Sequence, residues 1–111
     1  MPTRPYSGIW PVAPTPFTET GAVDDDGMRR VLDCMIDQGC DGICILANFS
    51  EQFLISDAER EHLTRLCLEH VAGRLPVIVT ISHFATDIAV ARARQANELG
   101  AAIVMMMAPY H

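Results

Sequence analysis

Hydrophobic residues recur along this chain in two alternating patterns. Short apolar runs at residues 9–13, 42–47, 76–81 and 101–107 are bounded by proline, glycine or polar residues, as β-strands are. Between the runs, apolar residues spaced three and four apart predict helices over residues 25–38, 57–71 and 86–99. Pro11 lies inside the first run and makes it the weakest strand prediction. The predicted order is strand, helix, strand, helix, strand, helix, strand.

Residues that typically begin and end helices lie at the boundaries of all three predicted helices. The run Asp24-Asp25-Asp26 predicts the start of the first helix, where carboxylates favour the helix dipole. Ser56 and Glu59 form a capping box before the second helix, and Thr86 is the predicted cap of the third. A glycine follows each helix, at positions 39, 73 and 100.

Strands that alternate with helices predict an α/β fold with a parallel sheet and right-handed crossovers. The second, third and fourth strands begin near residues 42, 76 and 101, which is the spacing of βα units. The chain shows no linker or low-complexity tract, so we expect residues 1–111 to form one structural unit.

Polar side chains gather just after the predicted strands, where parallel α/β folds bind their ligands. The segments after the strands read Thr15-Pro16-Phe17, Asn48-Phe49-Ser50-Glu51, Ser82-His83-Phe84 and Pro109-Tyr110-His111. We therefore expect a site at this edge of the sheet, although such residues also serve as simple caps. Ser82 and His83 are not a nucleophile–base pair, because adjacent strand residues point to opposite faces.

Composition excludes several classes of partner. The chain has 8 basic and 14 acidic residues and a net charge of −6, without the basic cluster that nucleic acid requires. It shows no membrane-spanning run and no signal peptide, so we expect a cytoplasmic protein. The four cysteines lack the spacing of a zinc site and are interpreted as small, reduced core residues. We predict neither a metal nor a cofactor.

The motifs GIWPVAPTPF, QGCDGICIL, LISDAERE, AGRLPVIV and ELGAAIVMMMAPY together span residues 8–110. In this combination the chain resembles the dihydrodipicolinate synthase / N-acetylneuraminate lyase family. The resemblance implies a Schiff-base lyase on a (β/α)8 barrel. Four parallel strands and three helices would be the first half of that barrel, because a complete one needs about 250 residues.

The family's second strand usually ends in Gly-Thr-Thr-Gly-Glu, which is Ala47-Asn48-Phe49-Ser50-Glu51 here. The variant LANFSEQF is similar to the branch that dehydrates 2-keto-3-deoxy sugar acids. It implies conversion of L-2-keto-3-deoxyarabonate to α-ketoglutarate semialdehyde. Two alternatives remain open: an aldolase or synthase of the same family acting on pyruvate, and a non-catalytic half barrel that only binds or assembles.

The expected site binds a small 2-keto acid. Asn48, Phe49 and Ser50 would hold its carboxylate and hydroxyl groups, and Glu51 would orient their loop. Ser82 and His83 are further candidates for substrate binding. The resemblance implies proton transfer at Tyr110, with His111 in place of the family's second tyrosine.

The resemblance also implies a Schiff-base lysine on a later strand, yet all eight basic residues of this chain are arginine. As written, the chain lacks the amine for imine chemistry. A half barrel also exposes two sheet edges. We therefore expect a part of a longer polypeptide, or association with another copy or partner, and a homo-oligomer of two or four subunits as in the family.

Overall fold

The computed structural model describes residues 6–107. Its elements are α1 (Asp25–Asp37), β1 (Ile43–Ile45), the 3-10 helix η1 (Gln52–Leu54), α2 (Asp57–Val71), β2 (Val77–Thr80), α3 (Thr86–Glu98) and β3 (Ile103–Met105). All three predicted helices and three of the four predicted strands are present. None of the helices in residues 6–107 is long and apolar enough to cross a lipid bilayer.

The prediction of a strand at residues 9–13 was wrong. This segment lies beside β1 but forms a single parallel bridge, between Val12 and Cys44. Two backbone hydrogen bonds flank the bridge, from Ala13 N–H to the Cys44 carbonyl (2.8 Å) and from Cys44 N–H to the Pro11 carbonyl (3.0 Å). Pro11 has no N–H to extend the ladder along β1, so the segment accompanies the sheet without becoming a strand.

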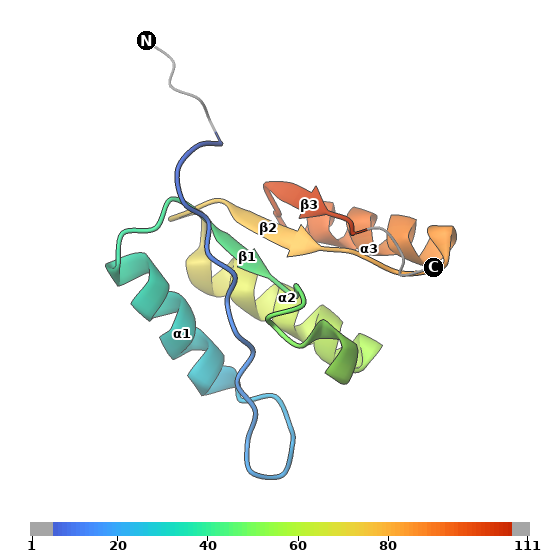
Figure 1. Cartoon of the computed structure of the whole chain (residues 1–111), viewed down its shortest axis with the longest axis horizontal. Coiled ribbons are helices and arrows are strands. Elements are labelled where there is room, and N and C mark those ends of the chain that lie inside the picture. Colours follow the sequence, from blue (N-terminus) through green and yellow to red (C-terminus); the bar gives the residue numbers. More distant parts are fainter. Residues whose placement is uncertain (1–5, 108–111) are drawn as a thin grey trace.

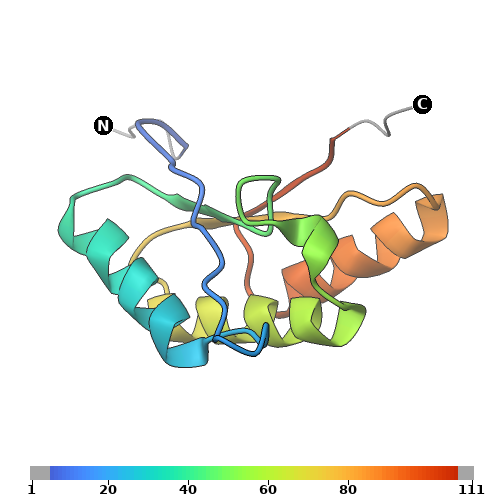
Figure 2. The same cartoon turned by 60° about the horizontal axis from the view of Figure 1, so that its bottom comes forward.

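The three strands form one parallel sheet in the order β1-β2-β3, and their arrowheads point the same way in Figure 1. Figure 2 shows all three helices on one face of that sheet. A doubly wound sheet carries helices on both faces, whereas a βα barrel keeps them all outside. The arrangement is therefore that of a barrel segment, as the sequence predicts.

The predicted start of the first helix and the predicted capping box of the second are confirmed. Asp24 accepts a hydrogen bond from Gly27 N–H at the start of α1, and Ser56 and Glu59 form the reciprocal capping box of α2. The predicted cap Thr86 was wrong, because α3 begins at Thr86 and its N-cap is Ala85, which has no side-chain cap. The ring of His83 accepts the Ala85 N–H instead, at 2.9 Å from Nδ1.

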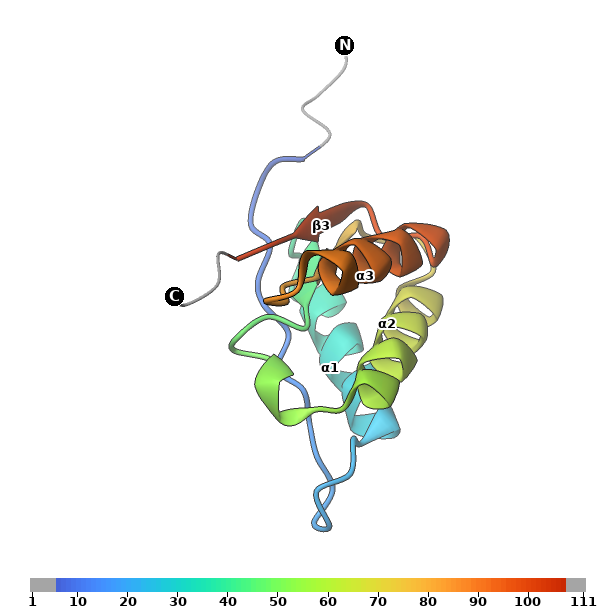
Figure 3. The same cartoon turned by 90° about the vertical axis from the view of Figure 1, so that its right-hand side faces the viewer.

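The hydrophobic core lies between the helices and the sheet. Each helix turns an apolar stripe inward, with α2 and α3 side by side on the same face (Figure 3). The core residues of the helices are Met28, Leu32, Met35, Leu63, Leu66, Cys67, Val71, Ala89 and Ala96. The Trp10 ring of the N-terminal segment packs against Gly42. A side chain at position 42 would prevent this packing, because a Cβ there would overlap the ring.

The helix-facing surface of the sheet is covered unevenly. Ile45, Val79 and Val104 occupy one row of the register, so their side chains share a face. Ile45 and Val79 are each 2% exposed, whereas Val104 on the edge strand is 40% exposed. The apolar surface of β3 therefore continues past the last described helix.

Burial predicts very different reactivities for the cysteines. Cys34 is exposed, whereas Cys67 is buried in the core and burial raises its pKa to about 12. Iodoacetamide in mildly alkaline buffer should alkylate Cys34 on the order of a thousand times faster than Cys67 in the folded protein, because the thiolate is the nucleophile. Peptide mapping measures both rates. Unfolding in urea should make the two alkylation rates equal. Equal rates in the folded protein, without urea, would contradict the burial of Cys67.

Candidate functional site

The polar segments after β1 and β2 lie at the same edge of the sheet, because parallel strands end together. The chain leaves β1 through Leu46, a buried residue in the left-handed backbone region at φ 60°. Glu51, at φ 62°, is a second left-handed residue in this loop. Such conformations cost non-glycine residues about 1–3 kcal/mol each and occur often in binding loops. The strain is localised at the motif that the sequence singles out.

Ser50 anchors this loop from inside the protein. It is 0% exposed, and its hydroxyl donates to the carbonyl of Ala13, which is itself buried. Its backbone N–H donates to the Ala47 carbonyl at 3.0 Å. Both donors of Ser50 are thus used within the fold, and the residue holds the loop against the N-terminal segment.

Asn48, Phe49 and Glu51 are exposed at the tip of the same loop. The Asn48 side-chain oxygen accepts a hydrogen bond from Gln52 Nε2 at 2.9 Å, which fixes the amide and turns its Nδ2 group away from Gln52. Phe49 is 68% exposed and places an aromatic ring beside these polar groups. Glu51 donates its N–H to the Asn48 carbonyl, which closes a tight turn.

Ser82 and His83 follow β2 and are both half-buried. The Ser82 hydroxyl accepts a hydrogen bond from Met107 N–H at 2.7 Å. Because His83 Nδ1 accepts the Ala85 N–H, the neutral ring carries its proton on Nε2. The structure therefore gives the two neighbours different partners, although both belong to the same loop.

Two arginines near these loops were not singled out in the sequence. Arg60 is 5% exposed on α2, and its pKa is lowered to about 10, first by burial and then by Arg92, against an opposing effect of Asp57. Arg92 on α3 donates to the Ser82 carbonyl and, at 3.2 Å, to Asp57 Oδ1. Sequence periodicity places these arginines on helices but does not show that the Arg92 guanidinium reaches the Ser82 carbonyl at the end of β2.

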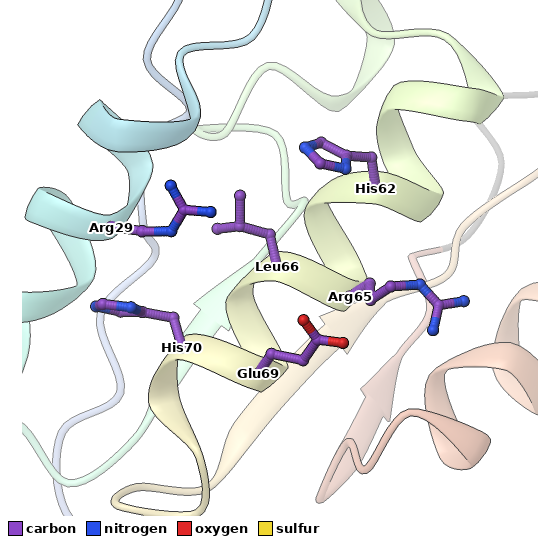
Figure 4. Close-up of a pocket in the computed structure, with 6 residues that line it drawn as sticks. All are labelled: Arg29, His62, Arg65, Leu66, Glu69 and His70. Atoms are coloured by element: carbon purple, nitrogen blue, oxygen red, sulfur yellow. The ribbon is translucent and has the colours of Figure 1, made fainter.

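The groove between α1 and α2 lies on the helical face, apart from the strand ends. It has a volume of about 270 Å³, and its lining residues are Arg29, His62, Arg65, Leu66, Glu69 and His70. Figure 4 shows both histidine rings turned toward α1. There His62 pairs with Asp25 at 2.8 Å and His70 with Asp33 at 2.7 Å. These contacts fasten one helix to the other.

No group of three potential metal-ligating side chains occurs within residues 6–107. The expected proton-transfer residues Tyr110 and His111 lie outside the described residues. The described part of the candidate site therefore consists of the loops after β1 and β2, with the end of β3 beside them.

A parallel sheet with all helices on one face and its polar loops at the strand ends is characteristic of barrels with a small-molecule site. The chain belongs to the dihydrodipicolinate synthetase family, whose model matches residues 5–111. The fold is accordingly a partial (β/α)8 barrel, as the sequence predicts.

Individual members of this family are similar to the chain along almost its whole length. It is 59% identical over 109 residues to the L-2-keto-3-deoxyarabonate dehydratase of Azospirillum brasilense, covering 98% of this chain and 35% of the relative. Its structure is similar to that of dihydrodipicolinate synthase from Aquifex aeolicus, with a TM-score of 0.91, 28% identity and coverage of 96% and 36% of the two chains.

A third match is N-acetylneuraminate lyase from Mycoplasma synoviae, with a TM-score of 0.91, 28% identity and coverage of 96% and 38% of the two chains. The chain thus spans little more than a third of the length of the proteins it matches.

Proposed function

We propose that this chain belongs to a Schiff-base lyase that dehydrates L-2-keto-3-deoxyarabonate to α-ketoglutarate semialdehyde. The observation that carries the proposal is the 59% identity, over nearly the whole chain, to a dehydratase of that name. The altered loop Ala47-Asn48-Phe49-Ser50-Glu51 supports it, because a changed loop at the strand ends changes which 2-keto acid is accepted.

The chemistry begins when an amine attacks the C2 ketone and water leaves, which gives a protonated imine. This imine is an electron sink, so a base removes a C3 proton and forms an enamine. The enamine expels the C4 hydroxyl group as water. A proton shift from C5 then gives an enol that becomes the aldehyde, and hydrolysis of the imine releases the product and the amine. One water is lost overall.

The loop after β1 is the proposed carboxylate cradle. The fold uses both donors of Ser50, so we assign the carboxylate contacts to the exposed turn at Asn48 and Phe49, through backbone N–H groups and the Asn48 amide. Glu51 orients this turn, and Phe49 limits the space beside it. His83, with its proton on Nε2, is a proposed donor to a substrate hydroxyl. Tyr110 and His111 remain the proposed proton-transfer residues.

Completion of the site requires residues beyond this chain. The chain has no lysine, and the 40% exposed Val104 leaves apolar surface on β3 uncovered. Phe53, Leu54 and Phe84 add exposed apolar surface near the strand ends, at 61%, 72% and 59%. These surfaces support a longer polypeptide that completes the barrel and, at the strand ends, assembly into a homo-oligomer.

A product assay tests the reaction. The protein that contains this chain is purified and supplied with L-2-keto-3-deoxyarabonate, and the products are identified by mass spectrometry. The expected product is α-ketoglutarate semialdehyde. Pyruvate and glycolaldehyde, from cleavage of the C3–C4 bond, would support the aldolase alternative that the similarity to N-acetylneuraminate lyase keeps open. No turnover of this acid or of pyruvate would support the non-catalytic alternative.

A further inference from the structure

The ends of β2 and β3 are joined by a side chain where the backbone ladder stops. The last backbone hydrogen bond between them runs from Ile81 N–H to the Met105 carbonyl, at 2.9 Å. Two residues past the end of β3, Met107 N–H donates to the Ser82 hydroxyl at 2.7 Å. Ser82 therefore extends the pairing of the two chain segments beyond the sheet, toward the edge that carries the candidate site.

A second contact fixes Ser82 from the helical side. Arg92 on α3 donates from Nη1 to the Ser82 carbonyl, and its side chain is only 18% exposed. The same guanidinium reaches Asp57, the first residue of α2, through Nη2. Asp57 is 92% exposed, so that ion pair adds little stability, whereas the charge-assisted bond to the Ser82 carbonyl is better shielded from water.

Ser82 and His83 consequently differ in what they offer a ligand. The hydroxyl and the carbonyl of Ser82 both have protein partners on neighbouring elements. His83 accepts the Ala85 N–H at Nδ1, so its neutral ring offers the Nε2–H to a substrate, whereas the Ser82 oxygen is already held by the Met107 N–H.

We infer that Ser82 and Arg92 are positioning residues that fix the end of β3 relative to the end of β2. Ser82 then acts by holding Met107 rather than as the substrate ligand expected from the sequence. Met107, which Ser82 holds, stands three residues before Tyr110 in the sequence. This inference rests on the proposed function only in its consequence for catalysis, because the hydrogen bonds themselves are features of the fold.

Hydrogen exchange tests the bond between the Ser82 hydroxyl and the Met107 N–H without reference to any substrate. Exchange of the Met107 amide is measured in the complete protein by mass spectrometry with residue-resolving fragmentation. Ser82→Ala should accelerate this exchange about tenfold relative to the unchanged protein, and Ser82→Thr, which keeps the hydroxyl, should restore most of the protection. Identical exchange in the unchanged protein and in Ser82→Ala would overturn the inference.

Kinetics separate positioning from substrate binding. Ser82→Ala and Arg92→Leu should each lower kcat about tenfold while KM changes less than about threefold, because the carboxylate cradle is left intact. Arg94→Leu, an exposed substitution on the same helix, is the matched control and should leave both constants unchanged. A rise in KM with unchanged kcat in Ser82→Ala would show a substrate ligand and overturn the inference.

The two proposals can fail separately. If the protein does not dehydrate the sugar acid, the proposed function fails. Hydrogen exchange of the Met107 amide still decides whether Ser82 fixes the end of β3 relative to the end of β2.

Discussion

With the 111-residue chain alone, borohydride reduction in the presence of pyruvate is expected to produce no side-chain adduct. A reducible imine requires a primary amine, and none of the 111 residues is a lysine. Arginine does not substitute, because its guanidinium stays protonated. Even Arg60, whose pKa burial lowers to about 10, remains cationic near pH 7. Intact mass and peptide mapping measure the result.

The same treatment of the complete protein should attach one reduced pyruvate to a lysine outside this chain. Turnover should likewise appear only with the completed barrel. We therefore expect activity from the complete protein and none from the 111-residue chain. Mixing the chain with a separately produced remainder of the barrel provides the control, because restored adduct formation would show that the chain supplies a competent surface. An adduct on a side chain of this chain, or turnover by the chain alone, would contradict the proposal that the Schiff-base lysine lies outside this chain.

Helices were predictable from this sequence because their evidence is local. Each has an apolar stripe at helical spacing and a glycine just past its end. The acidic run marks the start of α1 and Ser56 caps α2, as expected. The cap of α3 was mispredicted because a Thr before a helix looks like a cap in sequence. Only the structure shows that the ring of His83 accepts the Ala85 N–H in its place.

Features that depend on distant contacts were not predictable. Apolar residues at 9–13 indicate a strand, but proline limits the segment to one bridge. Ser50 looks like an accessible donor in the motif, because its partner Ala13 is 37 residues away in the sequence. The location of the site at the strand ends was predictable from topology, whereas the division of roles within it required the hydrogen bonds.

Replacing Ser50 by alanine should weaken both the fold and the site. The change removes the hydroxyl that donates to the Ala13 carbonyl, and both residues are buried, so that carbonyl is left without its partner. A buried polar group left unpaired costs about 1–3 kcal/mol of the free energy of unfolding. Urea denaturation measures that loss as a lower midpoint.

The same substitution releases the turn that carries Asn48 and Phe49 from the N-terminal segment. In the complete protein we expect kcat/KM to fall about a hundredfold, because small displacements of binding groups have effects of that size. Ser56→Ala is the matched control: it removes the cap of α2 and should cost about 1 kcal/mol. It lies after the loop and should leave kcat/KM within about twofold, since surface caps stabilise without touching substrate.

The pair of variants separates the two roles of a buried serine. If Ser50→Ala and Ser56→Ala lose similar stability and only Ser50→Ala loses activity, the loop must be held in place for catalysis. If both retain full activity, the anchoring of the loop to Ala13 serves the fold alone, and the carboxylate cradle forms without it. Loss of activity in both would mean that kcat/KM follows global stability, which the urea midpoints would reveal directly.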